Sequence, residues 1–426
     1  MSIFHKILHW LDDLAYVWRY ELRQVFHDEG VLLFCIVVPL VYPLLYSWIY
    51  NNESVHEVPV VVVDQSHSQL SRQFIRMCDA SPDVRVACYA VDLDDAQSLV
   101  SRQVVKGIYL IPEDFAAKVN RMEQASISVY CDMALMLTYK AIYQTAMAVS
   151  QRMGAGIQTR LAGKYTKREE VINASPLDVE EVAMFNPQAG YGTAILPAVL
   201  MLIIQQTLAL GIGLAAGTAR ERNRYGALVP IHPSYGGIGR IVSGKALCYL
   251  MVYAVMSTYL TIVVPRFFSF IHIASWQNLL ALMIPYLLAC VFFGMTVSCL
   301  VRYRENVILL MVFVSLPLLF LTGVSWPQTS IPGYLQGVSY LFPSTFGVRA
   351  YLRMNTMGAS ISDVAFELRC LWIQVAFYLG TACLVYGHQL RTTRQHATER
   401  LAYLRKKRDV RLALKSKNLN TTKTTD

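Results

Sequence analysis

Residues 190–217, GYGTAILPAVLMLIIQQTLALGIGLAAG, contain no charged side chain and decide the fold class of this chain. A helix needs about 20 apolar residues to cross about 30 Å of hydrocarbon, so this stretch predicts a transmembrane helix. The composition of all 426 residues agrees, because 54% are apolar and 16% are charged, with a mean hydropathy of +0.37. A soluble domain is about 25% charged. We therefore expect a membrane protein rather than a chain of soluble domains.

Five further stretches are long enough and poor enough in charge to span a membrane. The first begins too late, and its flank is too poor in basic residues, for a cleaved signal peptide, so we interpret it as a permanent anchor. The predicted fold class is an α-helical polytopic membrane protein with an inserted extracytoplasmic α/β domain. Its six transmembrane helices are expected near residues 31–50, 190–217, 241–264, 278–300, 306–324 and 369–388.

Basic residues are concentrated in alternate loops. The loop 218–240 contains four arginines, and the tail 389–426 holds 11 basic and 3 acidic residues. By contrast, the segment 51–188 holds 13 basic and 17 acidic residues. Short cytoplasmic loops carry an excess of Lys and Arg. We therefore expect both termini in the cytoplasm and the segment 51–188 outside. Because the basic excess lies in a tail, the pattern does not favour a nucleic-acid-binding body.

The chain divides into five predicted parts. Residues 1–30 have apolar side chains at three- and four-residue steps, with Asp12, Asp13, Arg19 and Glu21 between them, which indicates an amphipathic helix along the inner interface. The other parts are the first span at 31–50, the external domain at 51–188, a five-helix transmembrane domain at 189–390 and a basic cytoplasmic tail at 391–426.

The segment 51–188 is too long for a loop without structure of its own. Short β-branched runs alternate in it with helical pieces, a pattern typical of an α/β domain. The predicted strands are 58–63, 84–91, 107–111 and 127–131, the predicted helices are 69–78, 94–104, 113–119 and a long one at 134–161, and a return strand is expected at 179–185.

No motif for catalysis, metal binding or nucleotide binding is complete. Gly239–Ala246 comes one residue short of a phosphate-binding loop, because Ala246 lacks the required hydroxyl and no strand precedes it. We therefore expect no enzyme, no cofactor and no metal site. Three cysteines in the inserted segment, Cys78, Cys88 and Cys131, leave open whether one pair forms a disulfide.

Several stretches together resemble the permease subunit of type-two ABC exporters, in the subgroup with a large external domain between the first two spans. Their order along the chain, more than any single motif, carries the resemblance. They are the strand that ends at Asp64, the segments Gly107–Phe115 and Ile127–Asp132, the arginine-rich Ala219–Leu228, and the outer segment Thr322–Thr345.

The resemblance implies partners and a location. These are a separate cytoplasmic ABC ATPase and a second permease copy, identical or homologous, in the inner membrane of a bacterium. A periplasmic adaptor that leads to an outer-membrane channel often completes such assemblies. The loop 218–240 would then contact the ATPase, although its arginines also fit simple positive-inside charges. The expected coupling residues are Arg220, Glu221, Arg222, Arg224 and Tyr225.

The polar residues of the spans allow two interpretations. They either line a pathway for an amphipathic, lipid-like or drug-like cargo or only bond neighbouring helices, and the pathway candidates are Gln205, Gln206 and Thr207. The outer re-entrant segment 325–347 would act as a gate. Its candidate residues are Trp326, Pro327, Pro332, Phe342 and Pro343.

Two functions of different classes compete. The first is the membrane half of an ATP-driven exporter. The alternative is a membrane-anchored sensor or scaffold whose external domain binds a ligand or partner without transport. One or two spans after the domain would suffice for anchoring, whereas this chain has five predicted there, so the sequence favours the exporter.

Overall fold

The computed structural model describes residues 3–51, 55–121, 123–133, 135–162, 185–186, 190–222, 237–301 and 303–422. The chain forms two compact units. One comprises Met1–Asn51 with Tyr191–Asp426, and the other comprises Asn52–Gly190.

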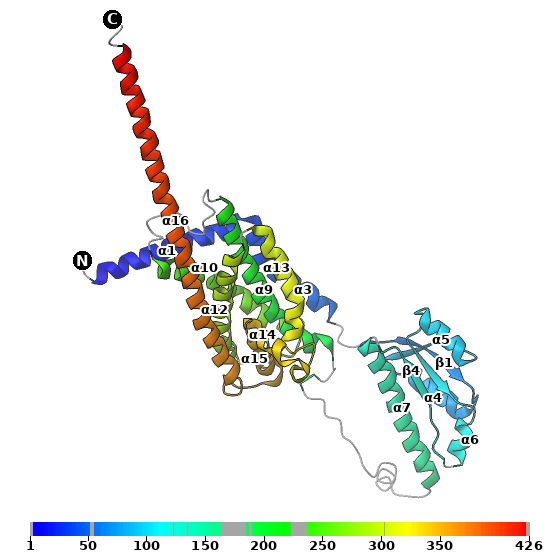
Figure 1. Cartoon of the computed structure of the whole chain (residues 1–426). Helices are drawn as coiled ribbons and strands as arrows, with labels where there is room; N and C mark the ends of the chain where they lie inside the picture. Colours follow the sequence, from blue (N-terminus) through cyan, green and yellow to red (C-terminus); the bar gives the residue numbers. More distant parts are fainter. Residues whose placement is uncertain are drawn as a thin grey trace. The chain divides into compact units, whose positions relative to one another are not determined.

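Six helices among the described residues are long and apolar enough to cross a membrane, which confirms the predicted number. Two of them are composite. The first span joins α2 (Glu29–Leu32), the π-helical turn η1 (Leu33–Val37) and α3 (Val38–Ile49), and the third joins α10 (Ile238–Thr258), η3 (Tyr259–Val263) and α11 (Val264–Phe267). The others are α9 (Tyr191–Arg222), α12 (Trp276–Leu300), α13 (Arg304–Leu321) and α16 (Ala365–Thr422), and Figure 1 shows them as one bundle.

Each of the two π-helical turns is followed closely by a proline. A proline ring clashes with the carbonyl four residues before it and cannot donate to that carbonyl. Pro265 follows η3 in this way, and Pro39 follows η1. The wider π-helical turn accommodates the ring. The carbonyl of Thr261, four residues before Pro265, accepts a hydrogen bond from the Tyr351 hydroxyl at 3.2 Å.

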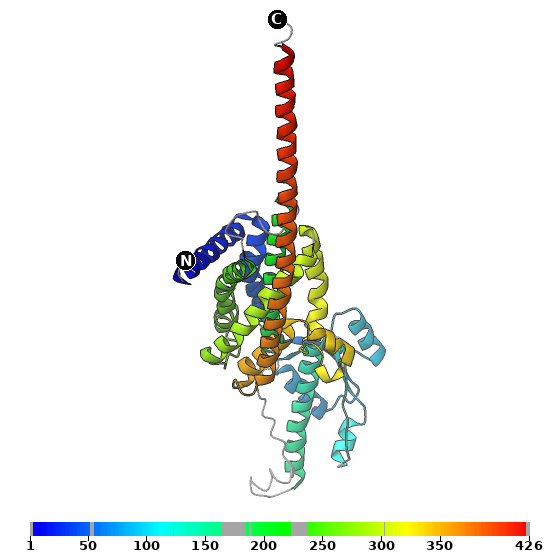
Figure 2. The same ribbon diagram turned by 60° about the vertical axis from the view of Figure 1, so that its left-hand side comes forward.

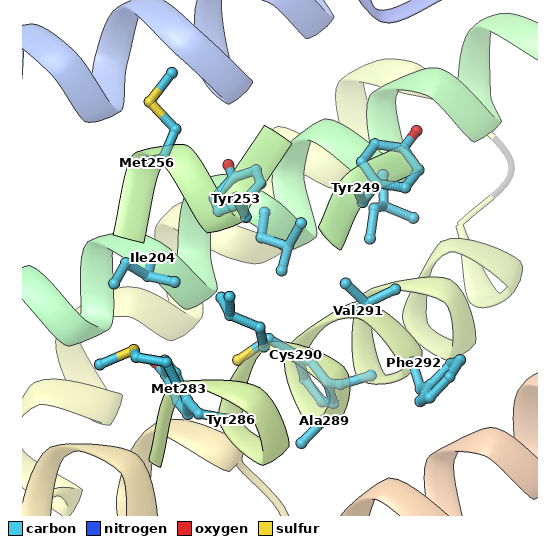
Figure 3. Close-up of a cluster of buried hydrophobic side chains, with 14 of the residues drawn as sticks. Ile204, Tyr249, Tyr253, Met256, Met283, Tyr286, Ala289, Cys290, Val291 and Phe292 are labelled. Carbon is cyan, nitrogen blue, oxygen red and sulfur yellow. The ribbon is translucent and has the colours of Figure 1, made fainter. Parts of the chain in front are cut away.

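The second span, α9, forms the centre of the bundle. In its most apolar stretch, 83% of the residues are buried, whereas in that of α13 the share is 17%. Figure 3 shows Ile204 of α9 among side chains of α10 and α12, which include Tyr253 and Tyr286. Both buried hydroxyls have partners, because Tyr253 donates to Thr207 Oγ1 at 3.0 Å and Tyr286 donates to the carbonyl of Met201 at 2.6 Å. These bonds fix α10 and α12 against α9.

Two helices lie outside the pattern of simple spans. The N-terminal helix α1 (Ile3–His27) runs across one end of the bundle (Figure 1), where it packs mainly on α10. The last span, α16, continues without interruption beyond the bundle to Thr422 (Figure 2). Gly387 of α16 lies against Ile238 at the start of α10, and α1 packs on α10 as well. The described parts near both termini therefore lie at the same end of the bundle.

The second unit is a four-stranded sheet with helices on both faces. Its strands have the order β2 (Val84–Tyr89), β1 (Val58–Asp64), β3 (Gly107–Ile111) and β4 (Ser128–Cys131), with β4 antiparallel and the others parallel. The predicted strands and helices of this segment coincide with the observed ones to within a few residues. The helices are α4 (Gln69–Asp79), α5 (Leu93–Ser101), α6 (Phe115–Asn120) and α7 (Met136–Ala162).

The strand β1 supplies both cores of this unit. Its side chains alternate between the two faces of the sheet, as the period of two requires. Val60 and Val62 pack with Phe74 of α4 and Ile142 of α7. Val61 and Val63 pack with Ala96 of α5 on the other face. An apolar strand that is buried on both faces is typical of a parallel sheet.

A further expected strand and the state of the cysteines complete the description of this unit. The return strand expected at 179–185 lies outside the described residues except for Phe185. All nine cysteines are free thiols in the structure. Burial raises the pKa of the Cys78 thiol to about 12, with a smaller contribution from the nearby Asp79. Cys78 therefore stays protonated and unreactive at neutral pH.

Glycine spacing on α9 determines how closely α13 approaches. A Cβ atom on Gly217 would lie 2.9 Å from the Cα of Arg304, whereas one on Gly380 of α16 would meet nothing within 4 Å. The Gly213–Gly217 pair thus forms the close helix contact that small residues at this spacing allow.

We predict that Gly217→Ala destabilises the purified protein by about 1–3 kcal/mol, because the methyl group must displace backbone. Gly380→Ala, the matched control, should leave stability unchanged or raise it by up to about 1 kcal/mol, since alanine favours a helix over glycine. Thermal unfolding in detergent measures both. Equal unfolding temperatures for the two variants would contradict the close contact.

Candidate functional site

Asp28 is the centre of a polar cluster at the end of the bundle where the first span begins, which we call the basic end. Its side chain is 2% exposed. The carboxylate accepts hydrogen bonds from Thr218 Oγ1 of α9 at 2.7 Å and from Arg304 Nη2 of α13 at 2.7 Å. It also caps α2, because the amides of Gly30 and Val31 donate to it at 3.1 and 3.3 Å. One carboxylate therefore joins three spans.

These partners keep Asp28 ionised. Burial alone would raise the pKa of its carboxyl, but hydrogen bonds from Thr218 and Val31 and the charge of Arg304 outweigh burial. The pKa consequently lies below its ordinary value of 3.8. Removing one member of a buried ion pair lowers the stability of the protein by more than the intact pair contributes to it, because the other charge is left buried without a partner.

Arg220, which the sequence assigns to ATPase coupling, is buried in this structure at 8% exposure. Its guanidinium donates to the carbonyl of Val301, and to that of Cys299 at 3.1 Å. The last carbonyls of a helix lack partners within the helix. Arg220 therefore satisfies the end of α12 and ties it to the end of α9.

The other predicted coupling residues have different positions. Glu221 is exposed and accepts a hydrogen bond from the amide of Arg304 at 3.4 Å. Arg222 ends α9. Arg224 and Tyr225 lie outside the described residues. A contact between this set and an ATPase stays a prediction.

The N-terminal helix is fixed to the basic end by two ion pairs. Lys245 of α10 donates to Glu21, and the two side chains are 9% and 2% exposed. Arg240 donates to Asp13 in the same way. Gly244 allows this approach, because a Cβ atom there would lie 2.8 Å from Val17.

One interpretation of the sequence is corrected by this packing. Glu21 was assigned to the polar face of an interfacial helix, but it is buried against α10 because it neutralises Lys245. Lys245 is accordingly a buried ion-pair partner. The stretch from Gly239 to Ala246, which approaches a phosphate-binding motif, is helical throughout. Gly244 and Lys245 in this stretch serve the packing of α10 against α1.

The three pathway candidates in α9 differ in environment. Gln205 is buried, and its Oε1 accepts a hydrogen bond from the amide of Ser344 at 2.5 Å. Thr207 bonds the carbonyl of Ile203 at 2.6 Å and accepts the Tyr253 hydroxyl. Gln206 is the exception, because both polar atoms of its side chain are buried without a hydrogen-bond partner among the described residues.

At the opposite end, short helices connect α13 to α16. They are η4 (Gln328–Ser330), α14 (Gly333–Ser339) and α15 (Pro343–Met357). The expected re-entrant segment, 325–347, overlaps the first five residues of α15. Trp326 is 58% exposed, and Pro327 and Pro332 precede η4 and α14.

Phe342 and Pro343 belong to the packed core rather than to a loop. The Phe342 ring meets Phe293 of α12 edge-on at 5.7 Å between centroids, and Pro343 is the first residue of α15 and is buried. Arg353 of α15 pairs with Glu367 of α16 at 3.0 Å. The first turn of α15 is therefore held between α9 and α12.

Asp28 and Glu21 were not predicted from the sequence as contacts between helices, whereas for Gln205 a helix contact was one of the two interpretations left open. A signal existed for Asp28, because a carboxylate directly before an apolar run is a common N-cap. For the buried pair no local signal exists, since Glu21 and Lys245 are separated by 224 positions.

The fold and these contacts define a polytopic membrane protein with an α/β unit inserted between its first two spans. Residues 30–384 match the family model described as ABC-2 family transporter protein. The chain therefore belongs to the ABC-2 transporter family, whose members are membrane subunits of ABC transporters. A search of the curated proteins finds no match to this chain.

We predict a pH dependence for the Asp28 cluster. A carboxyl whose pKa is lowered by folding contributes stability above its unfolded pKa, near 4, and this contribution is lost as the pH falls through the folded value. Asp28→Asn should therefore lower stability by about 2 kcal/mol at pH 7, because Arg304 loses its counter-charge. The difference from the unchanged protein should shrink as the pH falls below about 4.

Thermal unfolding in detergent at several pH values tests this prediction. The exposed Asp12→Asn on α1 serves as a control, since this side chain takes part in none of the ion pairs between described residues. A difference between Asp28→Asn and the unchanged protein that stays constant with pH would contradict a charged Asp28.

Proposed function

We propose that this chain is the permease subunit of an ATP-driven exporter that moves an amphipathic, lipid-like or drug-like cargo outward. A separate cytoplasmic ATPase would supply the energy. One observation carries the proposal, namely the family match that runs from the first span into the sixth. Five candidate spans after the inserted unit are also more than an anchored sensor needs.

We propose that the basic end faces the cytoplasm and that the inserted unit lies outside, in the periplasm of a bacterium. Arginines and lysines at this end support the orientation, since cytoplasmic loops carry them in excess. The acidic balance of the segment 51–188 supports it from the other side. A second permease copy, an adaptor and an outer-membrane channel remain proposals that rest on the family resemblance.

We propose a divided role for the arginines at the end of α9. Arg220 holds α12, so it would transmit movement from one helix to another rather than touch the ATPase. Glu221 and Arg222 follow directly and end the helix. A cation there suits charge-assisted contact with carboxylates of a partner.

We predict that Arg222→Glu reduces cargo-stimulated ATP hydrolysis of the purified complex at least tenfold. A reversed charge repels the carboxylates that it formerly attracted. Arg266→Glu, at the opposite end of the third span and exposed, is the matched control and should retain stimulation. Retained stimulation in Arg222→Glu, with the ATPase still bound, would remove this residue from the coupling contact.

The pathway is proposed to run beside Gln206. Gln206, Leu210, Gly213 and Gly217 share one helical face, because they are four, three and four residues apart. Leu210 packs with Val307 of α13, and Gly213 and Gly217 approach α13 directly. Gln206 therefore lies on the side of α9 that faces α13, the least buried of the six candidate spans. An amide without a partner in an apolar setting costs free energy, so its retention needs a reason.

We predict opposite effects for the two neighbouring glutamines. Gln205→Leu should destabilise the protein by about 1–3 kcal/mol, because the amide of Ser344 loses its acceptor. Gln206→Leu should leave stability equal or higher, since it removes two buried polar atoms without partners. In proteoliposomes with the ATPase, Gln206→Leu should nevertheless slow export of a fluorescent amphiphile at least threefold.

Thermal unfolding and transport are to be measured on the same preparations. Normal export by Gln206→Leu would exclude this side chain from the pathway while leaving the permease assignment intact. Loss of stability in Gln206→Leu would show that the amide bonds a neighbouring helix.

A further inference from the structure

The inserted unit contains a pocket that the transport proposal does not use. Its volume is about 590 Å³, within the range of about 300–1,000 Å³ that small-molecule sites occupy. Its lining comes from the end of β1, from α4 and from the end of β2. The lining residues are Asp64, His67, Arg72, Ile75, Arg76, Tyr89 and Ala90.

The position of the pocket follows from the sheet topology. The strands β1 and β2 are parallel neighbours, and they end at Asp64 and Tyr89. Both carboxyl ends therefore meet at one edge of the sheet. Open α/β sheets bind ligands outside the carboxyl ends of their strands.

The acidic group in the pocket is already occupied by the protein itself. Asp64 Oδ1 accepts the amides of Ser66 and His67, each at 3.1 Å, and Oδ2 accepts the Ser71 hydroxyl at 2.8 Å. The start of α4 is also satisfied, because Ser68 and Ser71 form a reciprocal capping box. Asp64 thus shapes the turn, and its oxygens already accept hydrogen bonds from the protein.

The basic groups have no such partners. Arg72 and Arg76 are one turn apart on α4, and both are exposed. Among the ion pairs between described residues, neither guanidinium takes part. Arg76 uses only Nε, which donates to the carbonyl of Arg72 at 3.2 Å. Two unpaired cations side by side are notable in a segment that has more acidic than basic residues.

The rest of the lining is apolar or aromatic. Ile75 forms a buried part of the wall, and Tyr89 is 66% exposed at the end of β2. An exposed aromatic ring next to a guanidinium pair suits a ligand with a flat or apolar body and a negative group, because arginine binds carboxylate and phosphate oxygens in pairs.

We propose that this pocket binds an organic anion, a carboxylate or phosphate ester with an apolar or ring-shaped body. The anionic group contacts Arg72 and Arg76, and the body lies against Ile75 and Tyr89. Two sources offer this chemistry, a soluble metabolite and the head group of an anionic lipid. The inference does not depend on the direction of transport.

The test uses the full chain in phosphatidylcholine nanodiscs, titrated with phenyl phosphate by calorimetry. The unchanged protein should bind saturably. Arg72→Gln combined with Arg76→Gln should weaken binding at least tenfold. The matched control, Arg85→Gln combined with Arg102→Gln, removes the same charge near the amino ends of β2 and β3 and should change binding less than twofold.

A third variant tests the ring. Tyr89→Ala should weaken binding of phenyl phosphate more than binding of inorganic phosphate. Unfolding temperatures within a few degrees of the unchanged protein verify that each variant is folded. Absence of saturable binding to the unchanged protein, or equal loss in the matched control, would overturn the proposal.

Competition distinguishes the two sources of the anion. Dihexanoyl-phosphatidylglycerol, kept below its critical micelle concentration, displaces phenyl phosphate if the site takes a lipid head group, whereas dihexanoyl-phosphatidylcholine does not. Retained binding of phenyl phosphate without displacement by either lipid identifies a soluble anion. A loss of transport in the Gln206 variant does not affect these measurements, so the two proposals fail separately.

Discussion

The ion pair between Asp28 and Arg304 is the constraint on which the arrangement of the spans depends. Helices surrounded by hydrocarbon gain no hydrophobic free energy from meeting one another, so packing and polar contacts must determine their partners. Asp28 binds the second and fifth spans while it caps the first. Arg220 connects the fourth span, α12, because it donates hydrogen bonds to the last carbonyls of that helix. A charge excluded from water has few alternatives, and this makes the arrangement unique.

The same reasoning explains how α1 is held. An amphipathic helix on a membrane surface is free to move along that surface, since its apolar face contacts lipid rather than a single partner. The buried pair of Glu21 and Lys245, together with the close contact of Val17 on Gly244, fixes both its position and its rotation. The helix is thereby a part of the bundle, and displacement of α10 must displace it too.

Hydropathy and periodicity made the fold predictable, whereas the site depended on pairings between distant residues. The six spans and the four strands were found because apolar runs and β-branched alternation are local properties of the chain. Arg220 illustrates the limit. Its place in an arginine-rich loop indicated a surface contact, but the carbonyls that it satisfies belong to Cys299 and Val301. Likewise, Gln205 and Gln206 are equivalent in sequence, and only the approach of Ser344 distinguishes them.

The uninterrupted course of α16 from the membrane to Thr422 has a mechanical consequence. The helix rises about 1.5 Å per residue, so the part beyond Gln395 extends about 40 Å from the end of the sixth span. Over this length, a small change in the tilt of the helix becomes a large displacement of its far end. A tilt of the span by about 10° would move its tip by about 7 Å, with no hinge in between to absorb the motion. The far end of α16 is therefore displaced much further than the span to which it belongs.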